Sequence, residues 1–210
     1  MNAVTKFHSE PETSPPLLWR LSLAAQRWIG WLCFPLLSGA LIAVMRLYGR
    51  YRFADLRGIR RRFRELVRTA DGAPVIVCAN HLTMIDSVLL AWAFASPLHY
   101  MLHFNRLTWN IPAIENFAQS RVQRLITYLG KCLPIDRSGS REHIDGVMSK
   151  VTYLLRSGEF FMIFPEGTRS RSGRFEVEEL TYGVGRLLQD VPEAHVLCAY
   201  LRCQSQDGHS

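Results

Sequence analysis

The chain has 210 residues, of which 48% are hydrophobic and 20% charged, with a formal net charge of +7 at pH 7. This length allows one domain with a substantial core and makes a second domain unexpected. The basic charge predicts anionic partners, which are nucleic acid, acidic lipid or phosphorylated substrates. The five cysteines are odd in number and form no CxxC pair, which indicates a reducing compartment and argues against a structural zinc site.

The N-terminal part of the chain is polar at first and then strongly apolar. Residues 1–16 contain three prolines and are expected to be a disordered tail. An uncharged stretch follows from Trp28 to Met45, interrupted by Pro35 and Gly39, and it approaches the ~20 residues that cross a bilayer. It fits a cleaved signal peptide, a spanning helix, or a hairpin or interfacial helix that dips into one leaflet. Its late start disfavours the signal peptide.

The next segment is rich in arginine. Nine arginines lie between residues 46 and 68, against only Asp55 and Glu65. Such a cluster beside an apolar segment is attracted to anionic headgroups by ~1 kcal/mol per charge and marks the cytoplasmic side. An arginine run alone also fits a nucleic-acid-binding helix or a solvated face, but the adjoining tryptophans favour the membrane. We expect a membrane-associated helical segment over residues 17–70 and no nucleic acid partner.

Strands and helices alternate in the remaining segment, residues 71–210. A β-branched, continuous apolar run predicts a strand at 74–79, and further short, largely apolar runs predict strands at 98–103, 132–135, 159–164 and 195–201. Apolar periodicity predicts helices at 84–95, 112–129, 140–157 and 175–189. The helix at 140–157 has the clearest signals, because Ser140 can cap it and Gly158 can end it. This alternation predicts an α/β fold with a mixed, largely parallel sheet flanked by helices.

A histidine and an aspartate follow the first expected strand, in the stretch ANHLTMIDSV from Ala79 to Val88. Ligands collect beyond the carboxyl ends of strands in such a sheet, and His81 stands at that place. A neutral imidazole there can take a proton from a hydroxyl, while Asp86 can hold the ring in the right tautomer. The spacing alone also fits a helix-capping or core role.

A second polar motif, FPEGTRS, follows the strand expected at 159–164. Gly167 lets the backbone approach a ligand, Thr168 offers a hydroxyl and an amide, and Arg169 can grip a phosphate. Arg137 follows another expected strand and can converge on the same phosphate. A histidine base next to arginines that bind phosphate predicts a phosphorylated alcohol as substrate. FPEGTRS by itself also fits an ordinary turn. The other histidines show no pairing, and no metal site is expected.

The two motifs together closely resemble those of the glycerolipid acyltransferases typified by bacterial 1-acylglycerol-3-phosphate acyltransferase. The resemblance covers residues 70–200 and the apolar, basic segment before them. It implies that His81 and Asp86 are the catalytic pair. It also implies that the acceptor's glycerol phosphate is bound by Arg137, Glu166, Gly167, Thr168 and Arg169.

The reaction implied by this resemblance is acyl transfer in phospholipid biosynthesis. His81 would deprotonate a hydroxyl of a lysophospholipid such as 1-acylglycerol-3-phosphate, which attacks the thioester of acyl-CoA or acyl carrier protein. No cofactor beyond this co-substrate is expected, and membrane phospholipids are the expected surroundings. The implied location is the bacterial inner membrane, with the catalytic domain on the cytoplasmic face. The alternatives are a non-catalytic or degenerate lipid-binding member, or a thioesterase or phospholipase that activates water.

The sequence departs from the family pattern in three places. No proline occurs in residues 194–202, where the family has a proline-bearing strand. A polar tail then ends the chain, so a C-terminally incomplete acyltransferase domain is one interpretation. The lysine-bearing segment common in the family is replaced by residues 102–112, which leaves the acceptor headgroup open.

Overall fold

A small parallel sheet forms the centre of the protein, seen in a computed structural model that describes residues 15–117, 119–170 and 183–202. Its order is β2-β1-β3, and both pairings are parallel. β1 is the central strand because its continuous apolar run packs against helices on both faces. The strands are β1 (Val75–Ala79), β2 (Phe161–Ile163) and β3 (His195–Ala199).

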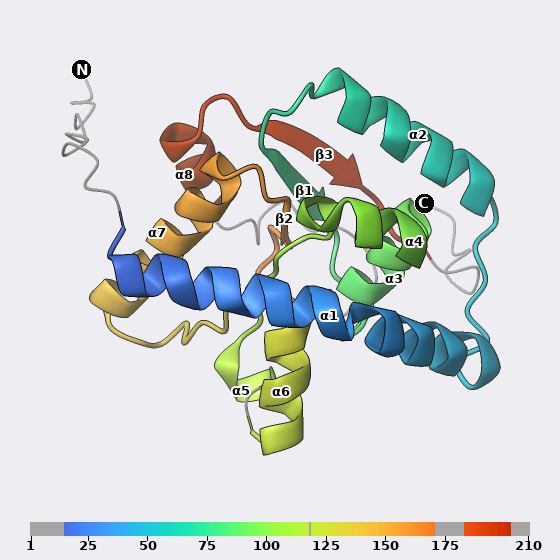
Figure 1. Ribbon diagram of the computed structural model, residues 1–210, viewed down its shortest axis with the longest axis horizontal. Helices are drawn as coiled ribbons and strands as arrows, with labels where there is room; N and C mark the ends of the chain where they lie inside the picture. The colour runs from blue at the N-terminus through green and yellow to red at the C-terminus, as the bar shows by residue number, and fades with distance from the viewer. Residues whose placement is uncertain (1–14, 118, 171–182, 203–210) are drawn as a thin grey trace.

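Helices surround this sheet in the described part of the chain (Figure 1). Their bounds are α1 (Leu17–Leu47), α2 (Leu56–Thr69), α3 (Asp86–Phe94), α4 (Pro97–Leu102), the short 3-10 helix η1 (Phe104–Arg106), α5 (Ile114–Phe117), α6 (Arg121–Leu129), α7 (Arg141–Arg156) and α8 (Gly183–Asp190).

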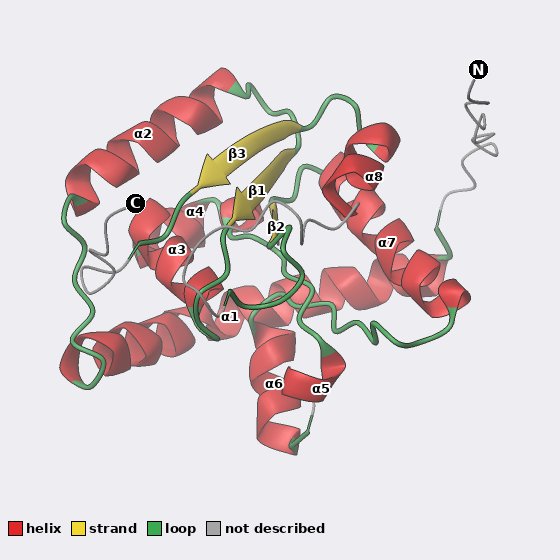
Figure 2. Cartoon of the chain, turned by 180° about the vertical axis from the view of Figure 1, so that it is seen from behind, coloured by secondary structure: helices red, strands yellow, loops and turns green. Residues whose placement is uncertain are grey.

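Two hydrophobic clusters cover the two faces of the sheet. Val75 and Val77 of β1 pack with side chains of α2, α3 and α4, such as Phe63 and Phe94. Ile76 points the other way and packs with side chains of α7 and α8. Figure 2 shows α2 and α3 on one side of the strands and α7 and α8 on the other. The expected α/β fold, with a parallel sheet between helices, is confirmed.

Three expected elements differ in the structure. The segment 98–103 is helical rather than extended, because Pro97 occupies the first turn of α4 and the Ser96 hydroxyl accepts from the His99 amide. The segment 132–135 makes only isolated bridges with the loop that contains Asn110 and Ala113. The helix expected at 112–129 is divided into α5 and α6 by a capping box at the start of α6, formed by Ser120 and Gln123.

The remaining expected elements are found, with small differences in their bounds. The strands at 74–79, 159–164 and 195–201 correspond to β1, β2 and β3, and the helices at 84–95 and 140–157 to α3 and α7. Ser140 caps α7 by accepting from the His143 amide, as expected. The helix expected at 175–189 overlaps α8, and its part before residue 183 lies outside the described residues.

The apolar N-terminal segment is one long helix, α1, which packs on the domain along its length (Figure 1). Leu23, near its start, joins the cluster beneath α7, Phe34 joins the opposite cluster, and Met45, near its end, packs on α3. Gln26 donates to two carbonyl groups, of Tyr128 and Cys132. The outer face is apolar and exposed, and includes Leu17, Leu18, Leu21, Trp28, Ile29, Leu32, Leu36, Val44 and Leu47. α1 is long and apolar enough to cross a membrane.

Charged side chains around the buried Glu159 connect α1 to the loop before β2. Lys131 is fully buried, and its Nζ donates to Glu159 Oε2 at 2.6 Å and to the carbonyls of Phe104 and Leu107. The Trp109 indole donates to the same carboxylate at 2.9 Å. Arg27 of α1 completes the group, with Nε 2.8 Å from Glu159 Oε1. Sequence patterns did not single out these residues.

Candidate active site

His81 and Asp86 form a pair where β1 leads into α3. The chain leaves β1 at Ala79, and Asp86 is the first residue of α3. His81 Nδ1 lies 2.8 Å from Asp86 Oδ2. That oxygen also accepts from the amides of Leu82 and Thr83, while the Thr83 hydroxyl donates to Oδ1. The N-terminus of a helix favours a negative charge, so this turn is suited to hold an ionised carboxylate.

The electrostatics of this turn define the state of the pair. Burial raises the pKa of Asp86, but the hydrogen bonds from His81, Thr83 and Leu82 outweigh burial and hold the pKa below its ordinary value. Asp86 is therefore ionised at neutral pH and can only accept hydrogen bonds. In the neutral imidazole of His81, Nδ1 then carries the proton that is shared with Asp86, and Nε2 is the nitrogen able to accept one.

Replacing Asp86 with asparagine is expected to reduce turnover about 10³- to 10⁴-fold, because the amide no longer holds the required tautomer of the imidazole. The KM values should change little, since Asp86 is buried behind His81. Steady-state kinetics measure both parameters. Asp71→Asn, in an exposed turn, is the matched control, and an Asp86→Asn variant with unchanged turnover would contradict this role.

The turn after β2 lies directly against this pair. The His81 ring stacks on Phe164, with 4.2 Å between ring centroids. The His81 amide donates to Glu166 Oε1 at 3.4 Å, and the Ser170 amide donates to the His81 carbonyl at 2.8 Å. Gly167 has a φ of 67°, which permits this tight turn and favours glycine. The two motifs, 85 residues apart between His81 and Glu166, thus meet at the carboxyl ends of adjacent strands.

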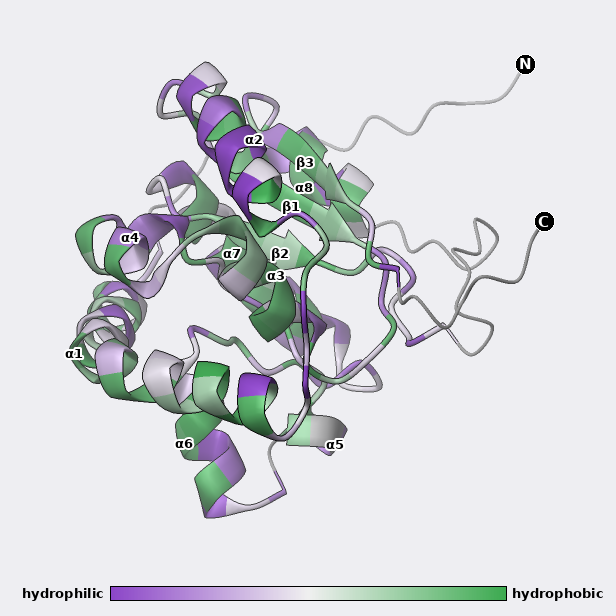
Figure 3. Cartoon of the chain, turned by 90° about the vertical axis from the view of Figure 1, so that its right-hand side faces the viewer, coloured by the Kyte–Doolittle hydropathy of each residue, from purple (hydrophilic) through white to green (hydrophobic). Residues whose placement is uncertain are grey.

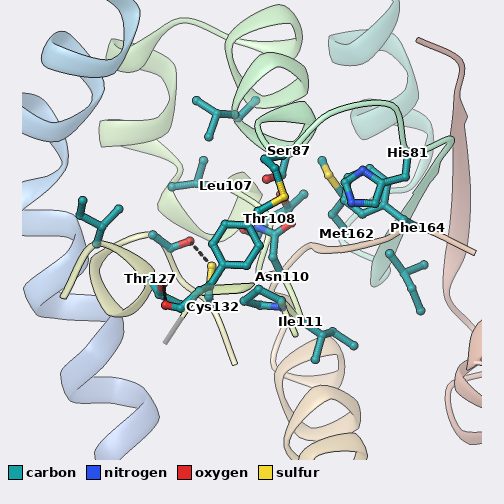
Figure 4. A pocket seen from close by; sticks show the side chains of 18 of the residues that line it. His81, Ser87, Leu107, Thr108, Asn110, Ile111, Thr127, Cys132, Met162 and Phe164 are labelled. Atoms are coloured by element: carbon teal, nitrogen blue, oxygen red, sulfur yellow. Dashed lines mark hydrogen bonds between the residues drawn. The ribbon is translucent and has the colours of Figure 1, made fainter. Parts of the chain in front are cut away.

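A cavity of about 550 Å³ opens beside His81 (Figure 4). His81 lines it together with Arg137 and the turn after β2. Arg137 donates a hydrogen bond to the Gly167 carbonyl, which holds the guanidinium beside that turn. The rest of the wall is mainly apolar. It includes Phe34, Leu37, Leu41, Met84, Val88, Ile111 and Ile126, contributed by α1, α3, α6 and the loops between elements.

The predicted site residues do not all occupy equivalent places. Arg137, Gly167 and Thr168 line the cavity. Glu166 also lines it, but its side chain is buried and accepts from the His81 amide, so it organises the turn. Arg169 is exposed and is not part of the cavity wall.

Sequence patterns missed much of the cavity wall. Polar residues such as Thr108, Asn110 and Thr127 line it, as Figure 4 shows, and α1 covers one side. The uncharged stretch within α1 predicted a membrane-associated helix, but no spacing in the chain links Phe34 to His81. Within the described residues no group of His, Cys, Asp and Glu side chains is arranged to hold a metal ion.

The fold and the site define a class of protein: an α/β domain in which a His–Asp pair borders a mainly apolar cavity. A family model described as Acyltransferase matches residues 59–201. The chain belongs to this family, that of glycerolipid acyltransferases such as the 1-acylglycerol-3-phosphate acyltransferases. It is an acyltransferase of lipid metabolism, whose substrates are lipids and acyl donors.

Proposed function

We propose that this protein transfers a fatty acyl group from acyl-CoA or acyl carrier protein to a hydroxyl of a lysophospholipid such as 1-acylglycerol-3-phosphate. The observation that carries this proposal is the His81–Asp86 pair beside a mainly apolar cavity that Arg137 also lines. A lysophospholipid has the matching parts: a hydroxyl, a phosphate and an acyl chain. The cavity volume falls within the range of small-molecule sites.

In the proposed reaction, His81 Nε2 accepts the proton of the acceptor hydroxyl as its oxygen attacks the thioester carbon. The new C–O bond forms, the C–S bond breaks, and the proton passes from His81 to the departing thiolate. Asp86 stabilises the imidazolium between these steps. Backbone N–H groups near the turn are the proposed donors to the oxyanion, and Arg137, which lines the cavity, is the proposed ligand of the phosphate.

We further propose that α1 lies in the plane of the membrane interface rather than crossing the bilayer. A helix of 31 residues is ~46 Å long, and this one packs on α7, α6, α4 and α3 in succession. A perpendicular crossing would take these elements into the hydrocarbon with it. The exposed apolar outer face is suited to one leaflet, at the proposed cytoplasmic face of a bacterial inner membrane.

The reaction is tested with purified protein in mixed micelles, a labelled acyl donor and a panel of lysolipids. The panel contains 1-acylglycerol-3-phosphate, lysophosphatidylcholine and an ornithine-type lysolipid. An acylated lipid product, formed best with the phosphorylated acceptor, is the expected result. Release of free fatty acid without such a product would instead identify a thioesterase or phospholipase. No turnover by folded protein with any donor would favour a binding-only member.

The phosphate role of Arg137 predicts a specific kinetic change. Arg137→Ala should raise the KM for 1-acylglycerol-3-phosphate about 10- to 100-fold, because a charge-assisted hydrogen bond contributes about 1.5–3 kcal/mol. Turnover at saturation should change much less, and the KM for the acyl donor should stay the same. Arg141→Ala, four residues further on and exposed, is the control. An unchanged acceptor KM would remove Arg137 from the phosphate site.

A further inference from the structure

A group of four basic side chains, outside the cavity wall, lies where α4 and η1 approach α2. We call it the α4 cationic cluster, and its members are Arg64, His99, His103 and Arg106. Arg106 Nη1 lies 3.5 Å from His99 Nε2, and the His99 and His103 rings have centroids 5.0 Å apart. α2 is held here by Arg60, which donates to the carbonyls of Trp92 and Ala95 just before α4.

The cluster has no anionic partner within the described residues. No Asp or Glu side chain of that part of the chain forms an ion pair with any of its members. Burial lowers the pKa of His99, and the charges of Arg106, His103 and Arg64 lower it further. These surroundings therefore disfavour a positive charge on His99, and an anion placed among the cluster would offset that effect.

The cluster borders the apolar surface that we assign to the membrane. Leu98 and Leu102 are exposed to 69% and 71% and lie on one face of α4, four residues apart. His99 and His103 each follow one position later, on the neighbouring face. α4 packs against α1, with the Trp31 indole donating to the Met101 carbonyl. Figure 3 shows α4 beside α1 on one side of the molecule, with α2 above them.

We propose that the α4 cationic cluster is a binding site for the phosphate of an anionic phospholipid headgroup, separate from the catalytic cavity. Leu98 and Leu102 enter the acyl region of the leaflet beside α1. The basic groups then lie at the level of the headgroup phosphates, where their charge-assisted hydrogen bonds are strongest. This inference rests on the proposed membrane docking of α1, but not on the acyl-transfer reaction.

The test is binding of the full chain to vesicles of phosphatidylcholine, with and without phosphatidylglycerol. Phosphatidylglycerol is chosen because it is not the product of the proposed reaction. We expect the unmodified chain to prefer the anionic vesicles, and Arg106→Gln to reduce that preference about tenfold. Arg62→Gln is the matched control, because it removes the same charge from an exposed position ~200° around α2 from Arg64. It should reduce the preference about twofold or less.

Equal reductions by Arg62→Gln and Arg106→Gln would overturn the site and leave only a diffuse basic surface. If Arg106→Gln does not fold, as judged by circular dichroism, His103→Gln replaces it, since His103 is exposed. NMR signals of the His99 and His103 rings distinguish the source of the phosphate. If inorganic phosphate shifts them as the anionic vesicles do, the assignment to a lipid is wrong. His81→Ala should bind vesicles normally, so this proposal and the proposed reaction fail separately.

Discussion

Replacing His81 with alanine will reduce acyl transfer about 10³-fold or more, because the hydroxyl of the acceptor then has no base within reach. The protein should stay folded, since Asp86 keeps its hydrogen bonds from Thr83 and Leu82. Membrane association should also persist, because the outer face of α1 is unchanged. Labelled product formed by the variant and the unmodified chain, in the same micelles, measures the loss.

The control for this experiment is His195→Ala, which removes an exposed histidine at the start of β3. It should leave the rate within about twofold of the unmodified chain, as expected for a surface substitution. Full activity of the His81→Ala variant would remove His81 from the mechanism. A variant that neither folds nor binds membranes would be uninformative about chemistry, and His81→Gln then takes its place because it keeps a polar side chain against Phe164.

Replacing Glu159 with glutamine will lower the free energy of unfolding by about 3–5 kcal/mol, since it leaves the buried Lys131 ammonium without its counter-charge. The same change removes the partner of Arg27, so the attachment of α1 is weakened as well. Chemical denaturation, followed by circular dichroism, measures the loss. Glu142→Gln, exposed in the first turn of α7, is the control and should change stability by less than about 0.5 kcal/mol.

A second variant distinguishes a charge effect from a packing effect. Adding Lys131→Met to Glu159→Gln removes both charges and should recover much of the lost stability, because an uncharged pair needs no compensation. A double variant less stable than Glu159→Gln alone would contradict this account.

The buried lysine also predicts a pH dependence. Burial lowers the pKa of Lys131 from its ordinary 10.5 to about 8, although Glu159 opposes this. Between these values the unfolded chain binds more protons than the folded one, so the contribution of Lys131 to stability increases with pH in this range. Lys131→Met should remove that increase.

Local patterns in the sequence were sufficient for much of the fold. β1 follows from a continuous apolar run, and α7 from its apolar stripe with Ser140 as cap. The segment 98–103 was predicted wrongly from its apolar composition, because Pro97 and the capping Ser96 begin a helix there. The apolar composition of a segment indicates that its side chains are buried, but it does not distinguish a helix from a strand. Here the N-cap residue decides in favour of a helix.

In the candidate site too, some features follow from local sequence and others depend on tertiary packing. The sequence by itself determined that a histidine, an aspartate and a glycine-containing turn stand at the ends of two parallel strands, because their spacing from each strand is local. Only the tertiary structure decided that α1 closes the cavity, that Arg137 reaches Gly167 while Arg169 stays outside, and that Lys131 is buried against Glu159. The physical reason is that these contacts join residues distant in the chain, so they depend on how helices pack and not on any periodicity along the sequence.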